Sequence, residues 1–246
     1  MSYLERYLAE EPQPLWQELL DEGDAVRNAG LAEDATAVAT EAMARVHRNL
    51  QRILARLDKL GYNFTDRQAA LLPPDPNVET LIASFETRVG PLPLALQAFY
   101  RVVGGVDWRG EMPGWSPMGP LLPDSPLNGV ADENICYPDP LMIPTLSSLL
   151  DECEVRQDEL TALERDEGLM VTFSPDYLGK TEPCGGLYGV LLPDPGLDTD
   201  LEVYGATTFT DYLRDALRWG GFPGLIQYQE PDVATVQALS AELESF

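Results

Sequence analysis

Apolar residues recur at steps of three and four between positions 35 and 60, and this spacing places them on one face of a helix. The apolar stripe consists of Ala35, Val38, Ala39, Ala42, Met43, Val46, Leu50, Ile53, Leu54, Leu57 and Leu60. Gly61 follows directly, and a glycine often ends a helix. The pattern predicts a long amphipathic helix whose stripe packs on the rest of the fold. Before it, residues 1–30 predict two short helices with a break near Pro12 and Pro14.

A proline-rich stretch at 71–77 separates this helix from the second group of elements. Asn77 is a favourable N-cap for the next helix, and Pro91 and Pro93 end that helix because proline lacks a backbone N–H. The mixture of helices and strands predicts an α+β fold, with the strands in one sheet. The predicted elements are helices over 78–89, 94–103, 146–165, 208–219 and 231–244, and strands over 106–108, 169–173, 186–192 and 201–204.

Charge narrows the choice of partner. The net charge is −25, and residues 107–202 hold most of the acidic excess. Nucleic acids and anionic membranes are repelled by a field of this sign, whereas a basic protein is attracted. The one concentrated cationic surface is the flank of the long helix, where five basic side chains fall within an arc of about 80°. These are Arg45, Arg48, Arg52, Arg56 and Lys59, and we expect them to meet the acidic segment 107–202 within the fold or in a homodimer.

Compartment and cysteine usage point to the cytoplasm. No run of about 18 apolar residues is present, so no membrane span is predicted. The first residues lack the basic and apolar regions of a secretory signal. Cys136, Cys153 and Cys184 are sparse and odd in number, which favours reduced core thiols.

Motifs for catalysis are missing from the sequence. His47 is the one histidine, and no nucleophile elbow or phosphate-binding glycine loop occurs. The acids of the 194–200 stretch lack the register of a calcium loop. We therefore expect no catalytic residue, no metal and no cofactor. An enzyme with an unrecognised carboxylate-based site and a regulatory or structural protein remain as alternatives.

One stretch carries a family resemblance. Residues 77–108 combine a helix ending in Glu and Gly, a Leu-Pro turn, an aromatic-bearing helix, Gly-Gly and a strand, and this resembles the SUKH superfamily of yeast cell-wall assembly regulators and bacterial immunity proteins. The matching positions are Phe85, Glu86, Gly90, Leu92, Pro93, Phe99, Gly104 and Gly105. Two features depart from the pattern: Val103 stands where a polar residue is common, and the loop 109–140 is long.

The resemblance implies a central antiparallel or mixed sheet flanked by helices over residues 71–246, with residues 1–70 as an N-terminal helical extension packed on the core. It implies a non-catalytic protein-binding domain, of an immunity or adaptor type. Toxins neutralised by such immunity proteins are often basic nucleases, which suits the acidic charge.

The long loop 109–140, rich in proline and glycine, is the place where we expect the partner to bind, together with the acidic loop 194–202. Tryptophan and tyrosine are enriched at binding hot spots, and acids at the rim speed capture of a basic partner. The candidate partner-binding residues are Trp108, Trp115, Tyr137, Asp124, Asp132, Glu133, Asp139, Asp194, Asp198, Asp200 and Glu202. The partner itself and the choice between monomer and homodimer are left open.

Overall fold

The predicted α+β class is confirmed. The computed structural model describes residues 1–116, 119–156, 158–159, 168–182, 185–202 and 208–246. Its helices are α1 (Tyr3–Ala9), α2 (Pro12–Asp21), η1 (Gly23–Arg27), α3 (Ala32–Leu60), α4 (Val78–Arg88), α5 (Leu94–Val102), α6 (Leu146–Val155), α8 (Phe209–Arg218), η2 (Pro223–Gln227) and α9 (Val233–Ser240). Its strands are β1 (Asn63–Phe64), β2 (Val106–Asp107), β3 (Gly110–Glu111), β4 (Met142–Ile143), β5 (Leu169–Pro175), β6 (Leu187–Leu192) and β7 (Leu201–Glu202).

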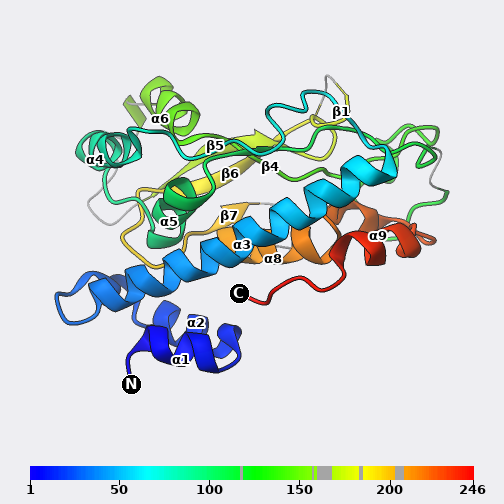
Figure 1. Cartoon of the computed structure of the whole chain (residues 1–246). Coiled ribbons are helices and arrows are strands. Elements are labelled where there is room, and N and C mark those ends of the chain that lie inside the picture. Colours follow the sequence, from blue (N-terminus) through cyan, green and yellow to red (C-terminus); the bar gives the residue numbers. More distant parts are fainter. Residues whose placement is uncertain (117–118, 157, 160–167, 183–184, 203–207) are drawn as a thin grey trace.

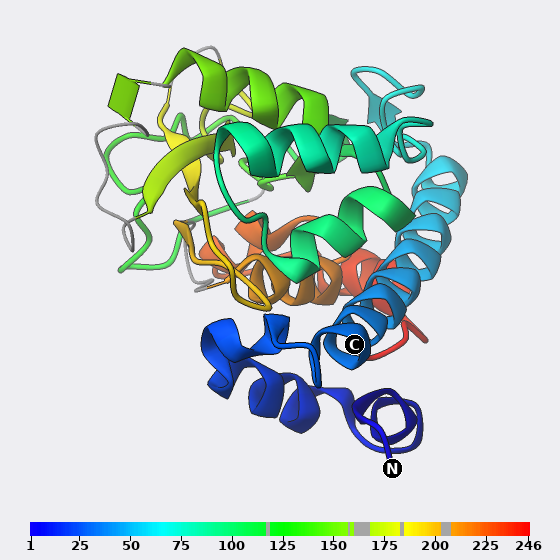
Figure 2. The same cartoon turned by 90° about the vertical axis from the view of Figure 1, so that its left-hand side faces the viewer.

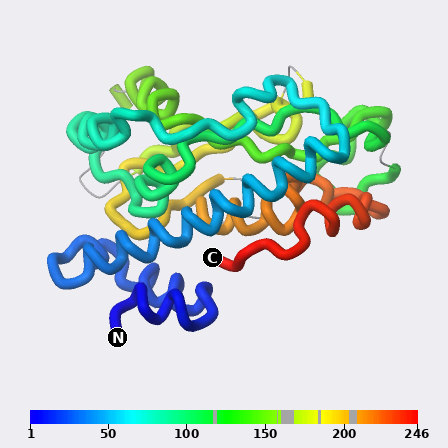
Figure 3. The backbone as a smooth tube through the Cα atoms, in the orientation of Figure 1, coloured from blue at the N-terminus to red at the C-terminus, as the bar shows by residue number. Residues whose placement is uncertain are grey.

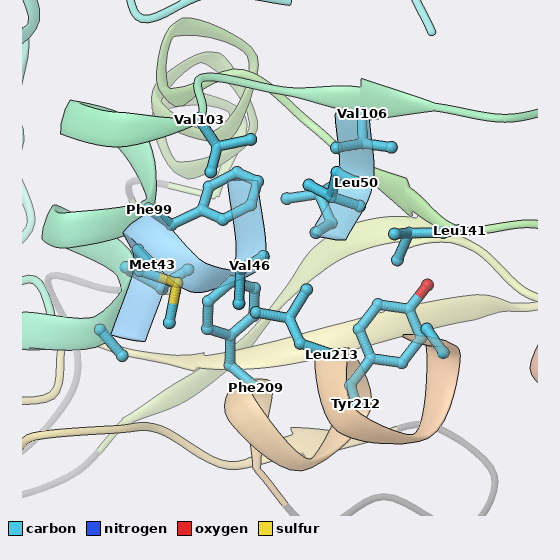
Figure 4. Packing of buried hydrophobic residues seen from close by; sticks show 14 of the residues in the cluster. Met43, Val46, Leu50, Phe99, Val103, Val106, Leu141, Phe209, Tyr212 and Leu213 are labelled. Atoms are coloured by element: carbon cyan, nitrogen blue, oxygen red, sulfur yellow. The ribbon is translucent and has the colours of Figure 1, made fainter. Parts of the chain in front are cut away.

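Helix α3 crosses the whole molecule and organises its core (Figure 1). Its apolar stripe is buried between α5 and α8, where Val46 lies close to Phe99 and Phe209 (Figure 4). The rings of Phe99 and Phe209 meet edge to face, with centroids 5.6 Å apart. Gly61 ends the helix in the left-handed conformation at φ 77°, as glycine readily does. One hydrophobic cluster therefore joins segments from all parts of the sequence.

The strands form three separate antiparallel ladders among the described residues, so the prediction of one sheet is wrong. The orders are β5-β6-β7, β2-β4 and β1-β3. The strand predicted at 106–108 is β2, which pairs with β4. It stops after Asp107 because that carboxylate accepts the backbone N–H of Arg109 at 3.1 Å and turns the chain. Residues 203 and 204 of the predicted last strand lie outside the described ranges.

The N-terminal helices pack against α3 and α8 at one side of the molecule (Figure 2). The Asp34 carboxylate accepts the backbone N–H groups of Tyr3 and Leu4, which fastens the start of α1 to α3. The predicted break between two short helices is present: α1 ends at Ala9, and Pro12 begins α2, because the first turn of a helix needs no N–H donor from that residue. The expected boundary near residue 71 stays a prediction.

Glu86 stabilises the turn between α4 and α5. It is one of the residues that match the SUKH pattern. Its carboxylate accepts the side-chain amide of Gln97 at 2.9 Å, and the same amide donates to the carbonyl of Leu92 at 2.8 Å. Gly104 ends the hairpin at φ 104°, and a Cβ there would stand 2.4 Å from the carbonyl oxygen of Pro73. The glycine is therefore needed for the close approach of the proline-rich stretch.

The last helix is shorter than the predicted 231–244, and the residues that follow it pack on α3. Helix α9 ends at Ser240, and residues 241–246 run back beside α3 (Figure 3). They contact the basic flank of α3, where Glu244 pairs with Arg48 and Arg52. The expectation that this flank meets the acidic segment 107–202 within the fold is wrong, because residues 241–246 supply a carboxylate and carbonyl acceptors to it. Its contact with that segment in a homodimer stays a prediction.

No helix within the described ranges combines the length and the apolar character needed to cross a bilayer.

Candidate partner-binding surface

The loop predicted to bind a partner is built from turn chemistry and fastened to the segment after α8. The Asn128 side-chain amide donates to the carbonyls of Leu122 and Pro123, at 2.8 and 3.0 Å. The backbone N–H of Leu122 donates to the carbonyl of Gln227 at 2.7 Å. These bonds satisfy the loop's backbone without a helix or a sheet, and they hold its outer turn at the surface.

The aromatic residues of the predicted site are inside the protein, which corrects their assignment as exposed anchors. Trp108, Trp115 and Tyr137 have relative exposures of 0%, 4% and 0%. The indole N–H of Trp108 donates to the carbonyl of Ala70 at 2.8 Å, and the ring of Trp115 packs edge to face on Phe222, with centroids 4.9 Å apart. Large rings with both their apolar bodies and their polar tips satisfied are core residues.

The buried Tyr137 positions the exposed residue Asp132. Its hydroxyl oxygen accepts the backbone N–H of Asp132 at 3.0 Å, and the hydroxyl donates to Glu182. The Asp132 carboxylate then accepts the backbone N–H and the side-chain amide of Asn134, which hold its pKa below the ordinary value. Asp132 is therefore an ordered and ionised surface carboxylate.

Asp139 is buried in an ion pair, so it is not part of the exposed surface that was predicted to bind a partner. Its carboxylate accepts Lys180 Nζ at 2.6 Å and the Tyr188 hydroxyl at 2.9 Å. Lys180 also lies over the Tyr188 ring, 4.7 Å from its centroid. Burial alone lowers the pKa of Lys180, but the Asp139 charge and the hydrogen bonds raise it above the ordinary value, so Lys180 stays charged. Lys180 was not among the predicted site residues. The sequence contains one hint of its special role: nearly all other basic residues of the chain are arginines.

Asp198 is also buried, and it binds the first turn of α8. Its carboxylate accepts the backbone N–H groups of Thr199 and Thr210, at 3.0 and 3.1 Å. Burial raises the pKa of Asp198 to about 6, and the hydrogen bonds partly oppose this shift. Asp194 is half-buried and accepts the N–H of Gly196 at 2.7 Å, and burial raises its pKa. Asp194 therefore stabilises a turn of its own loop, and Asp198 fastens that loop to α8.

Five of the predicted carboxylates are exposed: Asp124, Asp132, Glu133, Asp200 and Glu202. They do not form one face. The loop 119–140 lies at the end of the molecule near α9, whereas the 194–202 segment lies toward α5, to whose first residues it is bonded (Figure 1). The predicted joint surface of the two loops is therefore not present.

A hollow of about 270 Å³ opens within the loop 119–140. Asp132 and Glu133 lie on its wall together with apolar parts of Leu127, Ile135 and Tyr228. Tyr228 and Leu127 are themselves buried, at 5% and 1% exposure, so the apolar part is fixed by the core. The arrangement of two carboxylates above an apolar floor can accept a cationic side chain, whose stem is apolar and whose head is charged.

The protein's own cations do not neutralise these acids. Almost every lysine and arginine of the described chain forms an ion pair with a carboxylate, and the exceptions there are Arg56 and Lys59. None of these pairs involves Asp124, Asp132 or Glu133. These three loop carboxylates therefore keep their negative charge without an ion pair from the described residues.

Other candidate groups have ordinary structural settings. His47 is half-buried on α3, and its Nε2 lies 3.1 Å from the side-chain amide nitrogen of Gln51. Cys136 and Cys153 are free and buried, and burial raises the pKa of each thiol to about 12. Both are protonated at neutral pH, which makes them weak nucleophiles. Cys184 lies outside the described residues.

Comparisons with protein-family models, with curated proteins and with solved structures return no match for this chain. The resemblance of residues 77–108 to the SUKH superfamily therefore stays a prediction from the sequence.

Proposed function

We propose that this chain is a non-catalytic protein-binding protein of the immunity or adaptor type, and that its partner is a basic protein. The observation that carries the proposal is the distribution of charge. Among the described residues, all lysines and arginines except Arg56 and Lys59 are in ion pairs within the fold, while the carboxylates around the hollow of the loop 119–140 have no cationic partner there. Such a surface attracts a partner of positive charge and speeds its approach.

Chemistry of the hollow supports the same partner. A lysine or arginine side chain of the partner places its charged head at Asp132 and Glu133 and its methylene groups against Leu127 and Tyr228. Val130, which is 61% exposed, lies in the same loop and offers an apolar contact beside the acids. The contact thus combines a desolvated apolar spot with charged groups at its rim.

A cytoplasmic location and the SUKH-type architecture belong to this proposal. The sequence features described above support both, and the resemblance together with the charge supports the immunity or adaptor role.

Binding between this chain and the products of the genes beside its own tests the proposal. The variant Asp124→Lys, Asp132→Lys, Glu133→Lys reverses the loop, and Asp200→Lys, Glu202→Lys is its control at the other end of the molecule. We expect a basic gene product to bind the wild type and the control, and to bind the loop variant at least about tenfold more weakly. Equal loss in both variants would show that only net charge matters, and no loss in the loop variant would place the partner elsewhere.

A further inference from the structure

The closing segment 241–246 is held in a groove in the manner of a bound peptide. It has no helical or strand pairing, and its backbone is held by side chains of α3 and α8. The Asn49 amide contacts both the N–H and the carbonyl of Glu244, and Arg45 and Arg56 donate to the carbonyls of Ser245 and Ala241 at 3.0 and 2.7 Å. Because these hydrogen bonds go to backbone groups of the segment, peptides of different sequence can form them in the groove.

Two side chains of the segment add specificity. The Glu244 carboxylate lies 2.6 Å from Arg48 Nη2 and 2.8 Å from Arg52 Nη2. Phe246 is 5% exposed and lies beside Arg214, whose Nε donates to its carbonyl at 3.1 Å. The groove thus selects a carboxylate and, two positions later, an aromatic ring.

The resident segment fits this groove incompletely. A cavity of about 340 Å³ remains between it and α8, lined in part by Arg214, Leu217 and Arg218. The hinge residue Glu242 has φ 53°, a left-handed conformation that is unfavourable for a residue with a side chain. A separate peptide placed in the groove has no such hinge and can extend into the cavity.

We propose that this groove is a second recognition site, which segment 241–246 occupies in cis and which an acidic peptide with an aromatic residue two positions after a glutamate, supplied by a partner protein, occupies in trans. The site is cationic in an acidic protein, because four arginines, Arg45, Arg48, Arg52 and Arg56, lie along one flank of α3, and Glu41 of the same helix offsets only part of their charge. It therefore takes a ligand of charge opposite to the one proposed for the loop 119–140, and it does not depend on that proposal.

Fluorescence anisotropy with a labelled heptapeptide of sequence Ser-Ala-Glu-Leu-Glu-Ser-Phe tests the site. The receptor is the full chain, either wild type or Glu244→Arg, whose segment is repelled by Arg48 and Arg52. We expect the variant to bind the peptide at least about tenfold more tightly than the wild type, because its groove has lost the competitor. A peptide with lysine at the second glutamate is the charge control, and an oligodeoxynucleotide of seven residues is the polyanion control.

The proposal is overturned if the folded variant shows no saturable binding of the peptide, or if the lysine peptide or the oligonucleotide binds as well. A measurement on the wild type covers the case in which the variant does not fold. The backbone N–H of Glu244 is protected by Asn49, and its hydrogen exchange should accelerate at saturating peptide if the peptide displaces the segment. Unchanged exchange at a peptide concentration that gives a saturated anisotropy signal contradicts the proposal as well.

Discussion

Asn49 and Glu244 hold each other through two hydrogen bonds of 2.8 Å: the Asn49 amide donates to the carbonyl of Glu244, and its oxygen accepts the backbone N–H of Glu244. The two residues stand 195 positions apart, and Asn49 is fully buried. A single side chain of α3 thus fixes the path of the closing segment. The contact explains why a polar residue stands in the apolar half of α3.

Replacing Asn49 by alanine tests this relationship. The substitution leaves the N–H and the carbonyl of Glu244 without partners in a partly buried place, and we expect a loss of about 1–3 kcal/mol in the free energy of unfolding. Chemical denaturation of Asn49→Ala measures it, and Gln51→Ala, on the exposed side of the same helix, is the control with a change within about 0.5 kcal/mol. A loss of the same size in both variants would mean that the paired bonds contribute nothing of their own.

Trp115→Ala should lower stability rather than affinity. The indole is 4% exposed, and its Nε1 donates to Asp232 at 3.2 Å. Removing a buried tryptophan costs about 3–5 kcal/mol. Val130→Ala, at an exposed position of the same loop, should stay within about 0.5 kcal/mol of the wild type. Thermal or chemical unfolding of the two variants decides the matter, and an unchanged midpoint for Trp115→Ala would return this residue to the list of surface anchors.

The Lys180–Asp139 pair should show strong coupling. Lys180→Met leaves the buried Asp139 carboxylate without its cation, which costs about 3–5 kcal/mol. In the double variant Lys180→Met, Asp139→Asn the uncompensated charge is gone, and asparagine tolerates the left-handed backbone at φ 52°. We therefore expect the double variant to be more stable than Lys180→Met. Additive losses in a double-mutant cycle would contradict a buried pair of this kind.

Asp198 should make the protein less stable as pH rises through the range from about 4 to 6. Burial raises its pKa in the folded state from the ordinary value of 3.8 to about 6. Between these values the folded state binds more protons than the unfolded state, so the free energy of unfolding falls with increasing pH. Asp198→Asn lacks this titration. Relative to that variant, the wild type should lose on the order of 2 kcal/mol between pH 4 and pH 7. Parallel pH profiles for the two proteins would show that the carboxylate has no shifted pKa.

The helices were the most predictable part of the fold. The stripe of α3, the stops at Gly61 and Gly104 and the α4–α5 hairpin all depend on local spacing and on the chemistry of glycine and proline, which a sequence displays directly. The grouping of strands was not predictable in the same way. Whether β2 pairs with β4 or joins β5 is set by contacts between distant segments, and Asp107 ends the strand through a side-chain bond that no periodicity reveals.

The candidate site was predicted only in part. The loop 119–140 and its acids were found because composition alone marks them, and Asp124, Asp132 and Glu133 are exposed. Burial of Trp115 and Tyr137 could not be read from the sequence, since an aromatic residue in a loop has the same letter whether it anchors the loop or faces a partner. The predicted helix over 231–244 included the first residues of the closing segment, whereas α9 ends at Ser240. The binding of this segment to the arginines of α3 depends on the three-dimensional path of the chain.

The most direct test of the central claim is the association rate of the basic partner at increasing salt. If the acids of the loop 119–140 capture the partner, the rate constant should fall at least about tenfold between 0.02 and 0.5 M salt, and the variant Asp124→Lys, Asp132→Lys, Glu133→Lys should already be slow at low salt. The control Asp200→Lys, Glu202→Lys should keep most of the wild-type rate. A rate constant that is insensitive to salt, or that is lowered as much by the control as by the loop variant, would contradict the account.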